Sequence, residues 1–342
     1  MTLDRRTLLK HAAALGAVSL SMPALAESST DMTHVFGTGE TDRQLPTGDE
    51  MFLDHVGHFV RDPDAASKAL ARAGFAPTPV SVQVNPDPAG GSPRPTGTGN
   101  VTAMLRRGYL EILFKTADTP LGRELDEAIQ HYAGVHLAAF SVADAAKAHA
   151  RLDAAGFKTR PLVQLERPVA TQSGTGKAAF TVTRVAPEAM AEGRIQILTH
   201  HTEDTVWQKR WLTHPNGALA LVDVVIAVAD PDEAARRYAR FTDRPAAANA
   251  WGYAIVLERG RVQLASSDAT EAIVAGSPRG GLPFMCSYGV AVASLDQAQA
   301  KLHAGGIEST RRGRLVVAPF PPELGEGAWC FVETAAHLPW RT

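Results

Sequence analysis

The chain has few cysteines, few aromatic residues and almost no net charge. Only two of its 342 residues are cysteines, Cys286 and Cys330, which excludes a disulfide framework and a cysteine-rich zinc site. Aromatic residues make up 6% of the chain, and 34 basic residues stand against 36 acidic ones. This balance gives no basic surface for a polyanion, so we expect no nucleic-acid partner. The remaining composition is that of a soluble globular protein, and the length suits two domains.

The sequence also lacks an uninterrupted apolar run that is long enough to cross a bilayer. The apolar stretch at residues 11–25 is shorter than the ~18 residues required, and two serines and a proline interrupt it. It follows Arg5 and Arg6 and ends in a small-x-small sequence, which is typical of a signal peptide. The paired arginines resemble the twin-arginine export signal. That resemblance implies that residues 1–26 direct the folded protein through the twin-arginine machinery to the periplasm, without a stable membrane anchor.

The sequence becomes periodic after a polar segment, residues 27–50, which we expect to be a flexible linker. The stretch from Leu53 to Val60 alternates in the manner of a strand, and Asp62-Pro63-Asp64 then starts a helix that ends near Gly74. Three further strand patterns follow, up to Phe114. The unit therefore has the predicted order β-α-β-β-β.

The opening of this unit occurs four times in the chain. Residues 219–235 repeat it with the same Asp-Pro-Asp at the start of the helix, and shorter versions begin at Val135 and Ser287. The four modules form two pairs. The pairs are predicted at residues 51–205 and 219–336, with a connecting segment at residues 206–218.

Strand openings with Asp-His-Val, followed by Asp-Pro-Asp and Ala-Gly-Phe, resemble the vicinal-oxygen-chelate superfamily of glyoxalases, bleomycin-resistance proteins and dioxygenases. The similarity is greater to its glyoxalase-like proteins, and it spans Phe52 to Thr334. It implies an α+β fold in which each pair of modules forms a cupped eight-stranded mixed sheet with helices outside. It also implies a small-molecule substrate and a divalent metal held between the first and last strands of both modules.

The resemblance assigns the metal ligands to four residues of the first pair: His55, Glu111, His136 and Gln196. Imidazole and carboxylate groups are suitable ligands for divalent Zn, Fe, Mn or Ni. Two histidines and one carboxylate would also suit the open site of a non-haem Fe(II) oxygenase. Gln196 departs from the pattern, because most metal-binding members have Glu there and an amide adds no charge.

Glu111 is the candidate catalytic residue. It is a lone acid in an apolar strand, and a buried carboxylate is costly unless it is paired or bound to a cation. Asn100, Phe59 and Trp211 are candidate substrate-binding residues. We expect His58 to face a helix or solvent, and His200 to lie in a solvated connection.

The second pair has a poor set of metal ligands. Its equivalent positions are Asp223, Gln263, Ser287 and Cys330, without an imidazole. We therefore predict a degenerate domain that serves packing. Because Cys286 precedes Ser287, its side chain should face away from Cys330, and both thiols are expected to be buried and unbridged.

Two functions follow from these expectations. The first is a periplasmic enzyme whose metal binds vicinal oxygens and stabilises an enolate, with the choice among lyase, isomerase and dioxygenase left open. The second is a metal-free protein of the same fold that sequesters a small apolar or aromatic compound. The sequence leaves a homodimer open.

Overall fold

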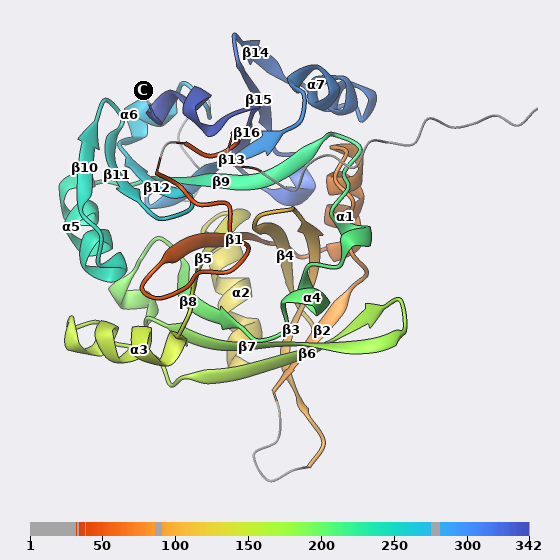
Figure 1. The fold of residues 1–342 in the computed structure, drawn as a ribbon, viewed down its shortest axis with the longest axis vertical. Helices are drawn as coiled ribbons and strands as arrows, with labels where there is room; N and C mark the ends of the chain where they lie inside the picture. Colours follow the sequence, from red (N-terminus) through yellow and green to blue (C-terminus); the bar gives the residue numbers. More distant parts are fainter. Residues whose placement is uncertain (1–31, 33, 38, 86–90, 275–280, 342) are drawn as a thin grey trace, which may run out of the picture. The chain divides into compact units, whose positions relative to one another are not determined.

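The computed structural model describes residues 32, 34–37, 39–85, 91–274 and 281–341. The predicted signal peptide, residues 1–26, lies outside the described residues. The four predicted modules are present as four successive β-α-β-β-β units (Figure 1). Two of them make up the first half of the molecule and two the second half.

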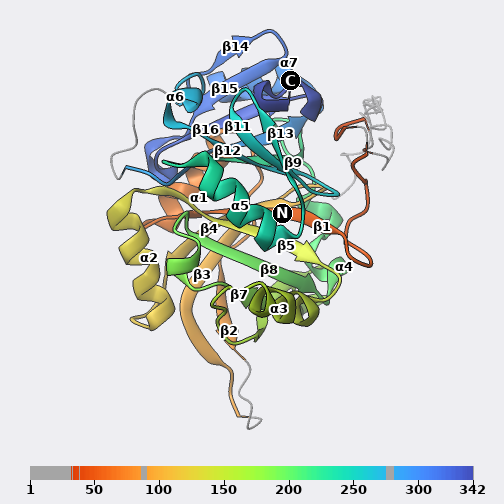
Figure 2. The same cartoon turned by 90° about the vertical axis from the view of Figure 1, so that its left-hand side faces the viewer.

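The first half contains strands β1 to β8. Its first module consists of β1 (Met51–Phe59), α1 (Pro63–Arg72), β2 (Ser81–Asn85), β3 (Arg94–Met104) and β4 (Tyr109–Lys115). Its second module consists of β5 (Gly134–Val142), α3 (Ala145–Ala154), β6 (Val163–Thr171), β7 (Gly174–Arg184) and β8 (Arg194–His200). Helix α2 (Pro120–His131) joins them and packs on β3 and β4, and Figure 2 shows α2 and α3 outside the strands.

The repeated Asp-Pro-Asp sequence forms the start of a helix in both halves. In α1 the backbone N–H of Ala65 donates to the side chain of Asp62 at 2.9 Å. In α5 the N–H of Glu233 donates to Asp230 at 3.0 Å. The proline that follows each aspartate occupies the first turn of the helix, where its missing N–H costs nothing.

The strands of the first half form a closed ring. Their order is β1-β4-β3-β2-β6-β7-β8-β5, and β5 pairs antiparallel with β1 to close it. The pairs β1–β4 and β5–β8 are parallel and the other pairs are antiparallel. The predicted cupped eight-stranded mixed sheet is confirmed.

The second half repeats this arrangement with shorter strands. Its first module consists of β9 (Ala218–Ala227), α5 (Pro231–Thr242), β10 (Ala246–Asn249), β11 (Gly252–Val256) and β12 (Arg261–Ala265), followed by α6 (Ser267–Thr270). Its second module consists of β13 (Phe284–Val292), α7 (Leu295–Ala304), β14 (Thr310–Arg312), β15 (Leu315–Pro319) and β16 (Ala328–Val332). The order is β10-β11-β12-β9-β13-β16-β15-β14, and one residue pair, Met285 with Val135, joins β13 to β5.

The central strands carry β-bulges at matching places. In the β1–β5 pairing, Asp54 is an extra residue of β1 and His136 is an extra residue of β5. In the β9–β13 pairing the extra residues at the matching places are Val222 and Cys286, and Leu219 is a further one near the start of β9. A bulge reverses the side-chain alternation beyond it, so the four matching positions determine which side chains enter each cup.

The two halves contact each other through matching turns. An added Cβ at Gly108 would lie 2.7 Å from the carbonyl oxygen of Asp54 and 3.1 Å from Cβ of Leu221. At Gly260 it would lie 2.7 Å from Cβ of Leu53 and 3.0 Å from the carbonyl oxygen of Val222. Each turn thus packs on the bulge of its own half and on a strand of the other, and only glycine fits at its positive φ.

The described part of residues 27–50, which the sequence predicts to be a flexible linker, contains buried apolar residues. Val35 and Phe36 are fully buried in an apolar cluster with Leu338 and Trp340. Their side chains pack on the second half. No helix among the described residues has both the length and the apolar character needed to span a membrane.

Candidate functional site

The inward-facing side chains of the ring enclose a cavity of about 40 Å³ in the first half, which we call the cup. Its polar lining combines an imidazole, a phenol, a carboxylate, two amides and three guanidinium groups. These groups belong to His55, Tyr109, Glu111, Gln83, Gln196, Arg167, Arg184 and Arg194. Three of the four predicted metal ligands therefore line one cavity.

His55 is held in one orientation by a buried carboxylate. Its Nδ1 lies 2.7 Å from Asp54 Oδ1, and the other oxygen of Asp54 lies 2.9 Å from Nε2 of His200. Burial alone would raise the pKa of Asp54, but the neighbouring imidazoles of His200 and His55 hold that pKa well below its usual range. Because an ionised Asp54 only accepts hydrogen bonds, His55 must donate Nδ1–H to it, and a neutral His55 has its lone pair on Nε2.

Nε2 of His55 faces the carboxylate of Glu111. The distance to Glu111 Oε2 is 3.6 Å, and Asn100 donates its amide N–H to Glu111 Oε1 at 2.6 Å. The two groups thus lie close together inside the cup, with the second oxygen of Glu111 held by Asn100. The ring of Tyr109 stacks on His55 at 4.2 Å and excludes water from one side.

Gln196 is held by an arginine and not by His55 or Glu111. Arg184 donates Nε–H to Gln196 Oε1 at 2.9 Å. Burial, together with the charges of Arg194 and Arg160, lowers the pKa of Arg184 to about 9. The amide oxygen that was expected to bind metal thus already accepts a hydrogen bond from a cation.

His136 does not join the other predicted ligands. It is the extra residue of the β5 bulge, its Nε2 lies 2.7 Å from the carbonyl oxygen of Tyr132, and its ring stacks on Tyr132 at 3.9 Å. Leu137 lines the cup instead. The bulge also changes which residue of the second half corresponds to His136. The extra residue of β13 is Cys286, so Cys286 corresponds to His136 and Ser287 does not.

The donors in the cup do not fit a resident divalent metal. Only His55 and Glu111 present free ligand atoms there, whereas catalytic metal sites ordinarily have three protein ligands. The fourth expected position is the aliphatic Leu137, and three guanidinium groups add positive charge. Among the described residues there is no cluster of three or more His, Cys, Asp or Glu side chains placed to hold a metal.

The predicted substrate-binding residues lie outside the cup lining. Asn100 supports Glu111 from the middle of β3. Phe59 lines a neighbouring cavity of about 200 Å³, where the guanidinium of Arg194 lies 5.1 Å from its ring. Trp211 lines a third cavity, which shares Arg167 with the cup.

Sequence reasoning missed Asp54, His200 and the three arginines. His200 is buried and contacts Asp54, in contrast to the solvated connection expected for it. The arginines come from β6, β7 and β8, where Arg167, Arg184 and Arg194 face inward as the strands alternate. Arginine in a strand is usually exposed, so no local signal marked these residues.

The second cup is filled by the chain itself. Asp223, the equivalent of His55, accepts hydrogen bonds from Trp340 Nε1 at 2.7 Å and Arg341 Nε at 2.8 Å. Arg341 also pairs with Glu40 at 2.7 Å. Cys286 and Cys330 are buried and free, as predicted. This half retains the sheet and has lost the site.

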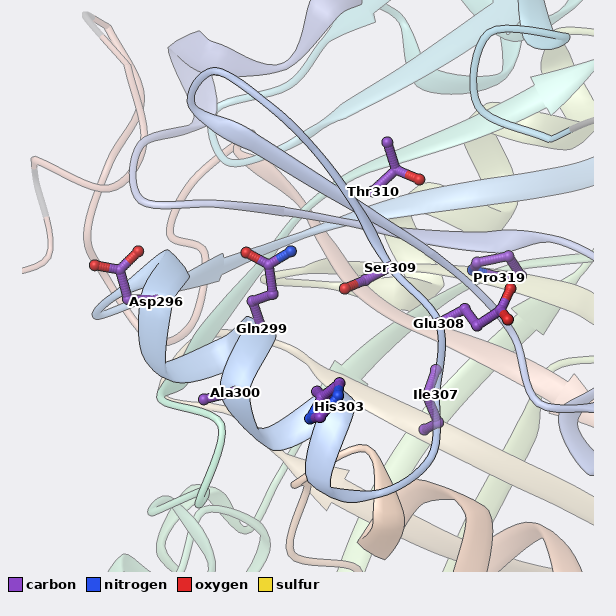
Figure 3. A pocket seen from close by; sticks show the side chains of 9 residues that line it. All are labelled: Asp296, Gln299, Ala300, His303, Ile307, Glu308, Ser309, Thr310 and Pro319. Atoms are coloured by element: carbon purple, nitrogen blue, oxygen red, sulfur yellow. The ribbon is translucent and has the colours of Figure 1, made fainter.

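A hollow in the second half has a different character and shares no lining residue with the cup. It measures about 780 Å³ and lies between α7 and the strands β14 and β15 of the second half (Figure 3). Asp296, His303 and Glu308, which carry its titratable groups, are exposed to solvent. We assign no chemistry to this hollow.

Comparison with protein families gives one match over more than half of the chain. Residues 53–242 match a family described as "Glyoxalase-like domain". This range includes the ring of the first half except the first two residues of β1, and it extends through α5. A comparison with curated protein sequences gives no match.

Solved structures share the fold at low sequence identity. A hypothetical protein from Staphylococcus aureus matches with a TM-score of 0.58 and 11% identity, covering 82% of this chain and 98% of that one. A mutant of 4-hydroxymandelate synthase from Streptomyces coelicolor has a TM-score of 0.53 and 14% identity, covering 84% and 94%. A fusion of a xylose isomerase-like TIM barrel with 4-hydroxyphenylpyruvate dioxygenase has a TM-score of 0.50 and 13% identity, covering 86% of this chain and 51% of that one.

Proposed function

Because the chain belongs to the glyoxalase-like domain family, we propose that its first half is an acid–base enzyme for a small oxygen-bearing molecule. The observation that carries this proposal is the buried line Asp54–His55–Glu111, in which Nε2 of His55 and the carboxylate of Glu111 stand 3.6 Å apart. A pair of titratable groups that shares one proton can take a proton from a substrate at one end and return it at the other.

The proposed step is an enolisation. His55 Nε2 takes a proton from the carbon next to a carbonyl, and protonated Glu111 gives its proton to the carbonyl oxygen. The C–H bond breaks, its electron pair forms the C=C bond of an enediol or enol, and no other reactant is needed. The reverse transfer at a neighbouring carbon would make the reaction an isomerisation.

Each surrounding group has a role in this step. Asp54 keeps the proton of His55 on Nδ1, so Nε2 stays available as the base. Asn100 orients Glu111 through Oε1. Burial and the charges of Asp54 and Glu111 raise the pKa of Tyr109 well above its usual value, so its phenol stays neutral beside the imidazole.

Hydrogen exchange tests the proposal. The purified chain is incubated in D2O with pyruvate, 2-oxobutyrate, dihydroxyacetone and methylglyoxal, and loss of the carbon-bound proton is followed by NMR. We expect catalysed exchange in at least one compound, and a loss of about 100-fold or more in His55→Asn and in Glu111→Gln. The exposed His303→Asn is the matched control and should exchange at the wild-type rate.

A protein that only binds its ligand is the second candidate. The three arginines of the cup favour a charged ligand over the apolar or aromatic compound expected from the sequence. Ligand binding without catalysed exchange in any of the four compounds would support this candidate and contradict the acid–base proposal.

We also propose that the protein works in the periplasm after export through the twin-arginine machinery. Support comes from Arg5, Arg6 and the short apolar stretch that follows them. Changing both arginines to lysine should leave the unprocessed chain in the cytoplasmic fraction. Unchanged export of this variant would contradict the assignment of the pathway.

A further inference from the structure

Arg167 is a buried cation in the wall of the cup. It lies on β6, is 8% exposed, and lines the same cavity as His55 and Glu111. Tyr109 lines this cavity too; burial lowers the pKa of Arg167, and the charges of Tyr109 and Glu111 oppose that lowering. Arg167 is therefore next to the groups proposed to move the proton.

The guanidinium of Arg167 has no partner within the described part of the chain. It makes no hydrogen bond and no ion pair there, although it carries five N–H donors. The other two arginines of the cup do have partners: Arg184 donates to Gln196, and Arg194 pairs with Glu124 at 3.4 Å. The nitrogens of Arg167 are not among the buried side-chain atoms without a partner, so they face the space of the cup and are available to a ligand there.

The charges that line the cup favour an anion. Three guanidinium groups face one carboxylate, Glu111, which already accepts a hydrogen bond from Asn100. A planar guanidinium offers two parallel N–H groups, and this geometry matches the two oxygens of a carboxylate. The volume of the cup, about 40 Å³, is enough for a few water molecules, so the group that binds there must be small.

We propose that Arg167 binds the carboxylate of a small organic acid in the cup and thereby selects the substrate. This inference rests on the proposed function for the identity of the reacting site. The carboxylate replaces water on Arg167 and completes the hydrogen bonds that this side chain lacks. The adjoining carbon then lies beside His55 and Glu111.

Binding of propionate tests this inference without any turnover. Calorimetric titrations compare propionate with propionamide, which has nearly the same shape and no charge. The wild-type chain should bind propionate at least about tenfold more tightly than propionamide, and Arg167→Gln should lose this preference. Arg167→Lys should retain part of it, because lysine keeps the charge and loses the two-pronged geometry.

Two control variants locate the effect. Arg160 lines the adjoining 200 Å³ cavity and pairs with Glu124, and Arg210 lies on the surface over Trp211. Arg160→Gln and Arg210→Gln should bind propionate as the wild type does. Loss of binding in Arg160→Gln with none in Arg167→Gln would move the carboxylate to the neighbouring cavity and overturn the inference.

Thermal unfolding separates ligand binding from a structural role. Without ligand, Arg167→Gln should unfold at the wild-type temperature or above it, because the substitution removes no side-chain hydrogen bond or ion pair within the described part of the chain. Propionate should raise the unfolding temperature of the wild type and not that of the variant. A lower unfolding temperature in the unliganded variant, with the preference for propionate kept, would assign Arg167 to the fold.

The outcomes distinguish this inference from the proposed function. Propionate binding that depends on Arg167, with no exchange in any tested compound, would sink the acid–base proposal and keep the carboxylate site. Exchange that depends on His55, with no preference for propionate over propionamide, would support the acid–base proposal and overturn the carboxylate site.

Discussion

Asp54 shows how one residue can set the chemistry of its neighbour. In a regular strand, consecutive side chains point to opposite faces. Asp54 is the extra residue of a bulge, and its carboxylate lies 2.7 Å from the imidazole of His55. His200 supports the second carboxylate oxygen from β8. The buried anion thus fixes which nitrogen of His55 faces the cup.

Asp54→Asn is therefore expected to slow the proposed proton transfer without unfolding the protein. The amide can donate a hydrogen bond to Nδ1 and so move the proton of His55 to Nε2, which removes the base. Exchange should fall by about 100-fold or more. Nitrogen-15 NMR of the histidines should report the changed tautomer. A variant that exchanges at the wild-type rate with an unchanged tautomer would show that Asp54 does not orient His55.

At the scale of the strand, one inserted residue in β5 changed the composition of the site. Without the bulge, the side chain of His136 would alternate into the cup; with it, Leu137 takes that place. The resemblance to the superfamily indicated His55, Glu111 and Gln196 from the sequence, and all three line the cup. A bulge at His136 leaves no comparable pattern, because no glycine or proline marks it.

Restoring an imidazole at the inward position should create a metal site. Leu137→His would place a third nitrogen or oxygen ligand beside His55 and Glu111. After incubation with zinc and removal of excess metal, this variant should retain close to one equivalent by elemental analysis. The wild type and His136→Ala should both retain less than about a tenth of an equivalent. Stoichiometric zinc in the wild type that is lost in His136→Ala would contradict our assignment of the ligands.

The sequence predicted the fold better than the site, because local sequence signals mark helices and turns but not the contacts made when the ring closes. The Asp-Pro-Asp helix starts and the glycine turns are local signals, and they located four modules. Arg167, Arg184 and His200 meet Glu111 and Asp54 only after the ring closes. Closure of the ring brings β6, β7 and β8 into one cup with β1 and β4. The spacing of these residues along the sequence does not predict that they lie together.

At the scale of the whole molecule, the two cups have different contents. The first has a cavity lined by polar groups, whereas Asp223 in the second is paired with Arg341 from the C-terminal segment. Glu40, from the segment before β1, completes this network. The segments before β1 and after β16 thus close the cup that lacks a site.

Arg341→Gln should destabilise the second half strongly. It would leave the carboxylate of Asp223 buried without its cation and Glu40 with Arg261 at 3.6 Å as its remaining cation, at an expected loss of about 3–5 kcal/mol in the free energy of unfolding. Urea denaturation measures this loss. The exposed pair of Arg311 with Asp296 supplies the control, since Arg311→Gln should change the free energy of unfolding by less than about 1 kcal/mol. Equal effects of the two substitutions would mean that the buried network does not hold the second cup closed.

The contact between the halves should make the whole protein sensitive to acid through His58. Contrary to expectation, His58 is fully buried; its Nδ1–H donates to the carbonyl of Leu324 at 2.8 Å, and Nε2 accepts from the hydroxyl of Tyr288 at 2.9 Å. Trp329 Nε1–H donates to that hydroxyl at 2.7 Å, so the hydroxyl proton of Tyr288 is free to point at Nε2 of His58. This series of hydrogen bonds suits only a neutral imidazole. Burial lowers the pKa of His58 to about 4, so the unfolded chain, with a pKa near 6.5, binds the proton first as the pH falls. The stabilisation is thus complete above pH 6.5 and is lost as the pH falls towards 4, by on the order of 2–3 kcal/mol.

Urea denaturation between these pH values tests the role of His58. The free energy of unfolding should depend less steeply on pH in His58→Gln than in the wild type and in exposed His303→Gln. The same slope in all three proteins would place the acid sensitivity elsewhere.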